Sequence, residues 1–157
     1  MRLTARMLRS KKSHVIGMII PKYDNRYFGS VAERFEEMAR ERGLLPIITC
    51  TRRSPDLEHE AVKAMLSWQV DWVIATGATN PDKISALCQQ AGVPTVNLDL
   101  PGSLSPSVIS DNYGGAKALT HKILANSARR RGSLAPLTFI GGRSSDHNTS
   151  ERLRGFH

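Results

Sequence analysis

Short apolar segments alternate with longer amphipathic segments along this chain. Each apolar run is about as long as a strand, and the amphipathic stretches repeat apolar residues every three or four positions, as a helix does. The runs that predict strands are 14–20, 45–50, 72–75, 93–98, 107–110 and 137–140, and the stretches that predict helices are 28–42, 56–68, 80–91, 112–125 and 147–156. This alternation predicts an α/β fold, a parallel sheet with helices on both faces.

Polar and charged residues follow most of the predicted strands, in the segments 22–28, 51–54, 76–79 and 141–148 and at Asp99. Open parallel sheets bind their ligands beyond the carboxyl ends of the strands. These segments are therefore candidates for the wall of a ligand crevice. Solvent-exposed loops have a partly similar composition, so the pattern alone leaves both interpretations open.

The formal charge of +8 is concentrated in two places. Residues 1–12 include five basic residues and no acidic one, and residues 129–131 are three consecutive arginines. Without these eight residues, basic and acidic side chains are equal in number. Local basicity of this kind favours local contacts with anions over a cationic surface everywhere. The segment 129–131 is expected to be a solvated loop rather than a nucleic-acid contact.

The remaining chemistry argues against an enzyme, a metalloprotein and a secreted protein. No glycine-rich phosphate turn, dinucleotide turn or nucleophile elbow is present, and the five histidines lack metal-ligand spacing. We therefore expect no catalytic residue, no metal and no cofactor. Cys50 and Cys88 are expected to be buried, reduced thiols. The apolar run 14–20 is too short for a secretory leader or a membrane span, which predicts a cytoplasmic protein without a membrane partner.

A series of short motifs runs in order along the chain. The strand that ends in Pro21 is followed by Asn-Arg-Tyr-Phe at 25–28, Ser-Asp-Asn-Tyr-Gly-Gly-Ala at 110–116, Phe-Ile-Gly-Gly at 139–142 and Glu-Arg-Leu-Arg-Gly-Phe at 151–156. This series resembles the bacterial LacI/GalR family of transcriptional repressors, whose effector domain is related to periplasmic sugar-binding proteins. Each motif is a weak signal alone, whereas the whole series is specific.

The resemblance implies a periplasmic-binding-protein-like type I fold, here incomplete, in three parts. Residues 1–12 correspond to the hinge helix and linker, 13–110 to the N-terminal effector subdomain without its return strands, and 111–157 to the start of a truncated C-terminal subdomain. In this family, paired hinge helices of a dimer enter the DNA minor groove and a leucine wedges between base pairs. Leu8 stands at that position, and Ala5 lies one turn before it. From the residues alone, a frayed basic helix is the alternative.

The departures from the family pattern also shape the expectation. The helix-turn-helix headpiece that precedes the family's hinge is absent from this sequence, so we expect no readout of base edges by this chain alone. Residues 112–157 supply too few elements to enclose a core of their own. The chain is therefore expected to be a fragment, or to need a partner that completes it.

The resemblance further implies a set of effector contacts. Arg152 matches a family arginine whose planar donor fork holds ligand hydroxyls or a carboxylate. Asp99 matches an acidic position that accepts hydrogen bonds from hydroxyls. The alternatives are a solvated helix arginine at 152 and a turn-forming aspartate at 99. The other implied contacts are Asn25, Tyr27, Phe28, Asp146 and Asn148.

The aromatic and loop residues of this set each have a second interpretation. Phe28 is expected in the crevice and Tyr27 at its rim, although either ring can also begin the core of the helix. Asp146 and Asn148 offer acceptors and donors that suit a neutral sugar, and they can equally cap the following helix. Arg26 replaces the family's usual proline, a change that can also admit an acidic effector.

These features together predict a ligand-responsive transcriptional regulator of the LacI/GalR type. A sugar or sugar derivative is expected to bind in the crevice between the subdomains. The family's homodimer contacts operator DNA through the headpiece and the hinge, and effector binding orders or releases the hinge helices. The alternative is a periplasmic-type sugar-binding protein of a transport system, which has no need of a basic hinge-like segment.

Overall fold

The computed structural model describes residues 12–131 and 136–157 of the chain. The chain forms two compact units, which divide between Ile109 and Ser110. Ala5 and Leu8, the expected hinge residues, lie outside the described residues.

The first unit contains a sheet in which all paired strands are parallel, in the order β2-β1-β3-β4-β5. The strands are β1 (Val15–Ile20), β2 (Leu45–Cys50), β3 (Trp72–Thr76), β4 (Thr95–Leu98) and β5 (Ser107–Val108). Gly17 of β1 lies opposite Ile47 of β2 and Val73 of β3, so β1 is a central strand. The expected parallel α/β sheet is confirmed.

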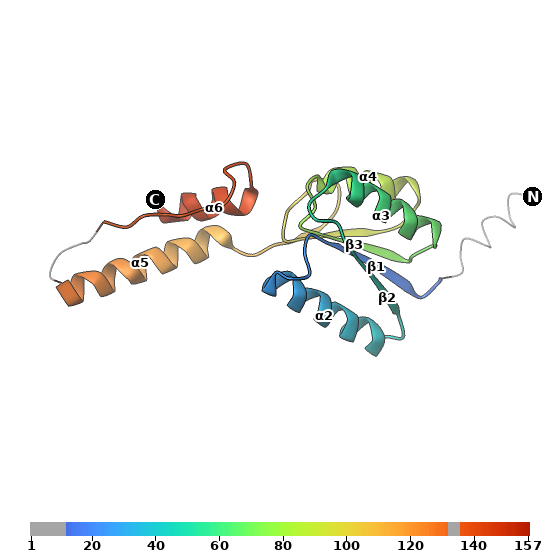
Figure 1. The fold of residues 1–157 in the computed structure, drawn as a ribbon, viewed down its shortest axis with the longest axis horizontal. Helices are drawn as coiled ribbons and strands as arrows, with labels where there is room; N and C mark the ends of the chain where they lie inside the picture. Colours follow the sequence, from blue (N-terminus) through green and yellow to red (C-terminus); the bar gives the residue numbers. More distant parts are fainter. Residues whose placement is uncertain (1–11, 132–135) are drawn as a thin grey trace, which may run out of the picture. The chain divides into compact units, whose positions relative to one another are not determined.

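Helices pack on both faces of this sheet. They are α2 (Arg26–Glu41), α3 (Pro55–Ser67) and α4 (Pro81–Gln90), with α2 on one face and both α3 and α4 on the other (Figure 1). Their amino ends are capped by Asn25, Ser54 and Asn80, whose side chains accept hydrogen bonds from backbone N–H groups of the first turn. Such caps satisfy donors that a helix cannot satisfy internally.

The main core lies between the sheet and the α3–α4 layer. Ile19, Val62, Met65 and Val73 are fully buried there. Gly17 permits this packing, because a Cβ at that position would lie 2.6 Å from Sδ of Met65. Close packing of this kind supplies most of the apolar burial in a small α/β unit.

The opposite face of the sheet has a smaller core of Met18, Ile20 and Ala32. Beside it, α2 and the sheet line an apolar groove of about 980 Å³ that reaches Ile74 and Val96. Within residues 12–109, no second helix covers this face. Parallel sheets are normally buried on both faces, so this open groove agrees with an incomplete fold.

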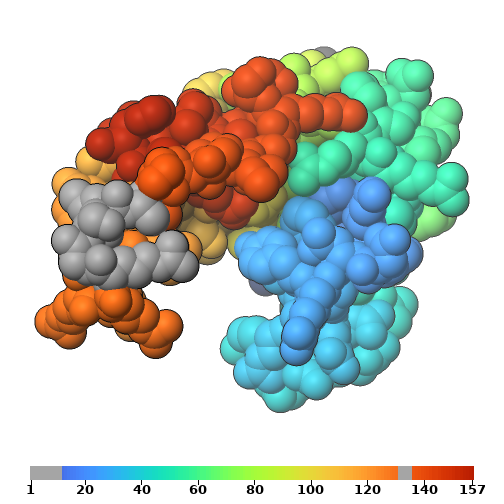
Figure 2. Space-filling model, turned by 60° about the vertical axis from the view of Figure 1, so that its left-hand side comes forward, coloured from blue at the N-terminus to red at the C-terminus, as the bar shows by residue number. Residues whose placement is uncertain are grey.

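The second unit consists of α5 (Asn112–Arg131), α6 (His147–Phe156) and the segment before α6. The two helices lie side by side in Figure 1, and the rings of Phe139 and Phe156 are 5.6 Å apart. In the space-filling view, the red atoms of α6 lie beside the orange atoms of the segment that precedes it (Figure 2).

Two expectations for this unit are wrong. Residues 137–140 form no strand, because the described part of the second unit offers no strand with which they could pair, and Ile140 is 91% exposed. The segment 129–131 lies in the last turn of α5 rather than in a loop. The helix continues past Ala125 because Ala128 and the three arginines are good helix formers and no glycine or proline occurs between Ala125 and Arg131.

The other element boundaries agree with the sequence pattern to within a few residues. The strand expected from 93 begins at Thr95, and the strand expected at 107–110 is only Ser107–Val108. Cys88 is buried as expected, and burial raises the pKa of its thiol. Cys50 is only half-buried because β2 is an edge strand of the sheet.

Asp71 holds the start of β1 against the start of β3. Its carboxylate accepts hydrogen bonds from the backbone N–H groups of Ser13 (2.9 Å) and His14 (3.0 Å) and from the hydroxyl of Ser13 (3.2 Å). His14 has a φ of 58°, a left-handed conformation that these bonds help to maintain. Burial by itself raises the pKa of Asp71, but these hydrogen bonds outweigh it and lower that pKa below its ordinary value.

We expect Asp71→Asn to lower the free energy of unfolding at pH 7 by about 1–2 kcal/mol, because an amide cannot accept all of these bonds. The carboxylate has a lower pKa in the folded state, so its stabilisation is present above the unfolded value of about 3.9. It is lost as the pH falls through the lower, folded pKa. Urea unfolding at a series of pH values should therefore show the difference between variant and wild type shrinking at acid pH.

The matched control is Glu60→Gln, which removes an exposed carboxylate on α3. It should leave the urea midpoint close to that of the wild type. Equal midpoints for Asp71→Asn and wild type at pH 7 would contradict the role of this carboxylate.

Candidate functional site

Asn25 lies in the loop between β1 and α2 and directly precedes α2. Its Oδ1 accepts hydrogen bonds from the backbone N–H groups of Tyr27 (3.0 Å) and Phe28 (3.3 Å). The sequence folds in this way because an asparagine at the N-cap satisfies the free donors of the first helical turn. The cap fixes the backbone that carries both aromatic residues.

The two rings differ in exposure. Phe28 is 6% exposed, whereas Tyr27 is 45% exposed, and the rings meet edge to face with centroids 5.2 Å apart. Phe28 packs against Gly77, which follows β3 with a φ of 56°. A Cβ on Gly77 would lie 2.8 Å from Cγ of Pro21 and 3.4 Å from the Phe28 ring. The glycine therefore lets the loops after β1 and β3 meet around Phe28.

Arg53 joins this edge, although the sequence analysis did not single it out. Arg52 and Arg53 follow β2 with φ values of 54° and 55°, a conformation that residues other than glycine rarely adopt. The guanidinium carbon of Arg53 lies 6.0 Å from the centroid of Phe28, at the limit of a cation–π contact. The available signal was the position of two arginines in the segment that follows a strand.

Asp99 follows β4 and is half-buried, with a φ of 74°. Its backbone N–H donates to the carbonyl of Val108 (3.0 Å), which extends the pairing of β4 with β5. Aspartate tolerates left-handed backbone better than most residues. The structure thus places this predicted site residue at the carboxyl edge of the sheet, in a conformation that a larger side chain would strain.

The loop after Asp99 is attached to α4 by Asp82. The carboxylate accepts hydrogen bonds from the N–H (2.7 Å) and hydroxyl (2.7 Å) of Ser103 and from the N–H of Leu104 (3.1 Å). The hydrogen bond from the Ser103 hydroxyl and those from the two N–H groups lower the pKa of Asp82. Asp82 therefore remains a carboxylate at neutral pH and restrains the chain that follows Asp99.

Glu58 plays a similar part at the next loop and was also missed by the sequence analysis. Its side chain is 2% exposed, and it accepts hydrogen bonds from the N–H (3.0 Å) and the hydroxyl (2.8 Å) of Thr79. A buried carboxylate needs such partners. Glu58 therefore connects α3 to the loop after β3. A glutamate in the first turn of a helix gives no sequence signal for this contact.

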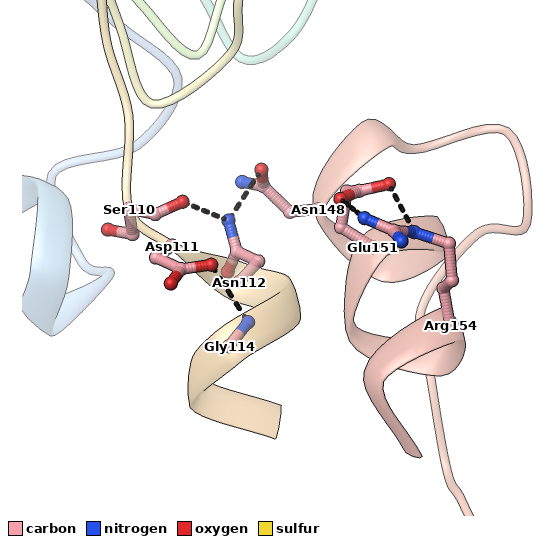
Figure 3. Close-up of polar contacts among 7 residues, drawn as sticks. All are labelled: Ser110, Asp111, Asn112, Gly114, Asn148, Glu151 and Arg154. Atoms are coloured by element: carbon pink, nitrogen blue, oxygen red, sulfur yellow. Dashed lines mark hydrogen bonds and ion pairs between the residues drawn. The ribbon is translucent and has the colours of Figure 1, made fainter. Parts of the chain in front are cut away.

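The second unit brings Arg152 and Asn148 together through Asn112. Nε of Arg152 donates to Oδ1 of Asn112 (2.8 Å). Nδ2 of Asn112 donates in turn to Oδ1 of Asn148 (3.0 Å) (Figure 3). Asn148 is 6% exposed, whereas Arg152 is exposed. Asp146, the remaining predicted residue, caps α6 through the N–H of Thr149 (3.1 Å).

The helix pair has further contacts one turn along α6. Arg154 forms an ion pair with Glu151 (2.8 Å) (Figure 3). Its guanidinium carbon also lies 3.8 Å from the ring centroid of Tyr113. The hydrogen bond from Arg154 lowers the pKa of Glu151. Gly155 faces the α5 backbone, and a Cβ there would collide with the carbonyl oxygen of Tyr113. The glycine thus allows the close approach of α5 and α6.

The arrangement is suited to binding rather than to bond making. The first unit offers an aromatic surface, the guanidinium of Arg53 and the carboxylate of Asp99, and the second unit offers the guanidinium of Arg152. Residues 12–131 and 136–157 contain no group of three or more side chains that could hold a metal ion. In the same residues, no helix has the length and apolar character needed to cross a bilayer.

A family model described as periplasmic binding proteins and sugar binding domain of the LacI family matches residues 13–157. The chain belongs to this family. It is also 95% identical over 139 residues to the ribitol operon repressor of Klebsiella aerogenes. That match covers 88% of this chain and 52% of the relative, so the chain spans about half the length of that protein.

Solved structures show the same fold. The Cra transcriptional dual regulator of Pseudomonas putida, in complex with fructose 1-phosphate, matches with a TM-score of 0.79 and 24% identity over 92% of this chain and 52% of that one. A periplasmic solute-binding protein of an ABC transporter from Actinobacillus succinogenes, with bound D-allose, matches with a TM-score of 0.78 and 20% identity over 93% and 54%. At these identities the likeness concerns the fold, and the fold is shared by regulators and transport proteins.

We expect Gly155→Ala to destabilise the second unit by about 1–3 kcal/mol, because the added methyl group forces α6 away from α5. The matched control is Gly115→Ala on α5, where a Cβ would meet no atom within 4 Å. That variant should be neutral or more stable, since alanine is the better helix former. Circular dichroism during thermal unfolding measures both. Identical melting of the two variants would show that the close approach is not required.

Proposed function

We propose that this chain is the effector-binding part of a LacI-type operon repressor, and that its effector is a sugar or polyol. The observation that supports this most strongly is the 95% identity to a ribitol operon repressor. A five-carbon polyol or sugar is therefore the first candidate. The protein would act in the cytoplasm as a regulator, not as an enzyme.

The effector contacts that we propose in the first unit lie at the carboxyl edge of the sheet. The exposed ring of Tyr27, which meets the buried ring of Phe28 edge to face, supplies an aromatic surface for the C–H faces of a sugar. Asn25 fixes the backbone that carries both rings. Asp99 supplies carboxylate oxygens, which are hydrogen-bond acceptors of the kind that hydroxyl groups contact. These groups together suit a ligand with several adjacent hydroxyls.

In the second unit we propose Arg152 as the direct contact, with Asn148 and Asp146 in support. Arg152 is exposed, while Asn148 is buried against Asn112 and Asp146 caps α6. A guanidinium donates several hydrogen bonds from one plane and accepts none. Arg152 is therefore suited to hold ligand oxygens that accept hydrogen bonds.

The first test is thermal unfolding of the chain with ribitol, other pentitols, pentoses, hexoses and sugar acids. A ligand that binds the folded state raises Tm, and 100-fold excess over Kd adds about 2.7 kcal/mol of stability. We expect one five-carbon compound to raise Tm. Arg152→Lys and Asp99→Asn should each reduce that increase without removing it, whereas Glu60→Gln should keep it. Cooperative unfolding that no compound shifts would contradict the proposal.

We also propose that the intact regulator binds operator DNA as a homodimer and that residues 1–12 form its hinge, with Ala5 and Leu8 toward the minor groove. The support is the basic composition of this segment and the family to which the chain belongs. Phosphate contacts by basic residues make DNA affinity fall steeply with salt. Segment 1–12 is therefore expected to carry the salt dependence.

Fluorescence anisotropy with a labelled DNA duplex tests this assignment. Replacing Arg2, Arg6 and Arg9 by serine should weaken DNA binding. It should also make the logarithm of the association constant fall less steeply with the logarithm of the salt concentration, by the amount expected for the loss of about three phosphate contacts. Replacing Arg129, Arg130 and Arg131 by serine removes the same charge from the end of α5 and should leave affinity nearly unchanged. A large loss of DNA affinity in the second variant would show that the DNA contact lies on α5 rather than in segment 1–12.

A further inference from the structure

Asn112 is the first residue of α5, and every polar group of its side chain is engaged. Nδ2 donates to the carbonyl of Ser110 (3.2 Å) and to Oδ1 of Asn148 (3.0 Å), while Oδ1 accepts from Nε of Arg152 (2.8 Å). Figure 3 shows Asn112 between Ser110 and Asn148. One side chain thus connects the start of α5 to two residues of α6.

The direction of these hydrogen bonds is determined by chemistry. A guanidinium can only donate, so Asn112 must turn its oxygen toward Arg152. Its amino group then faces Asn148, which must present its own oxygen. Asn148 is 6% exposed and lies in the first turn of α6, so burial restricts the movement of its side chain. A single orientation of both amides satisfies all of these contacts.

This arrangement restrains an exposed arginine. Fixing the Nε–H direction of a planar guanidinium also fixes the plane in which its two terminal amino groups lie. A free arginine on a helix surface must lose rotamer freedom when it binds a ligand, whereas a restrained one has already lost much of it. The contact uses Nε and leaves the terminal amino groups available to a ligand.

We propose that Asn112 is a positioning residue for effector binding: it orients the guanidinium of Arg152 so that the terminal amino groups meet the oxygens of the effector. The inference rests on the proposed function, in which Arg152 contacts the effector. Asn112 itself need not touch the ligand. It acts through Arg152, so its effect on affinity depends on the presence of that arginine.

The first experiment needs no ligand. In the ¹⁵N-labelled chain, the Arg152 Nε–H resonance is assigned by its disappearance in Arg152→Lys, and its hydrogen exchange is measured. Asn112→Ala should speed that exchange about tenfold, as loss of a hydrogen bond to a charged group implies. Asn112→Asp keeps an acceptor and should preserve slow exchange. Asn126→Ala, an exposed asparagine farther along α5, is the matched control. Fast exchange in the wild type would overturn the proposal.

The second experiment measures affinity by calorimetric titration with ribitol, or with the compound of the panel that raises Tm most. Asn112→Ala should weaken binding about tenfold, and Asn112→Asp should recover most of the loss. In an Arg152→Lys background, Asn112→Ala should cost nothing further. An equal loss in both backgrounds would overturn the positioning role, because Asn112 would then act independently of Arg152.

The two proposals fail in different ways. If no compound binds the wild-type chain, the proposed function fails, while the exchange measurement still decides whether Asn112 orients Arg152. If ribitol binds and Asn112→Ala leaves the hydrogen exchange rate of the Arg152 Nε–H unchanged, the positioning role fails and the proposed function stands. A Tm equal to that of the wild type for Asn112→Asp excludes a general loss of structure as the cause of any change in that variant.

Discussion

The parallel pairing of β1 with both β2 and β3 is the constraint on which the first unit depends. Because these strands run in the same direction, the residues that follow them all emerge at one edge of the sheet. This edge therefore brings together residues that are far apart in the sequence: Asn25, Arg53, Gly77 and Asp99. The packing of Phe28 against Gly77 shows that the loops at this edge touch one another.

Carboxylates restrain the loops that the sheet brings together. Glu58 holds the N–H of Thr79, Asp82 holds those of Ser103 and Leu104, and at the opposite end of the sheet Asp71 holds those of Ser13 and His14. In each case a carboxylate accepts hydrogen bonds from backbone that no strand or helix satisfies. Such bonds are stronger than neutral ones and keep irregular backbone in one conformation. They give the edge of the sheet the rigidity that a binding site needs.

In the second unit, a glycine and an asparagine restrain the candidate site. Gly155 allows α6 to approach the backbone of α5, and that approach brings Arg152 within hydrogen-bond distance of Asn112. Wider helix spacing would separate the two side chains. Packing and binding chemistry are thus coupled here, since the position of a guanidinium depends on the absence of a Cβ one turn away.

The sequence by itself determined the order of elements, the parallel sheet and the family, because period and motif are local properties that neighbouring residues carry. Its errors arose where local pattern was insufficient. Residues 137–140 have the composition of a strand but no partner, and α5 continues to Arg131 because nothing local stops it. Only the tertiary structure showed that Arg53 lies over Phe28, that Glu58 holds Thr79 and that Asn112 joins Arg152 to Asn148. These contacts join residues 21 to 40 positions apart, and no periodicity encodes which side chains meet across such separations.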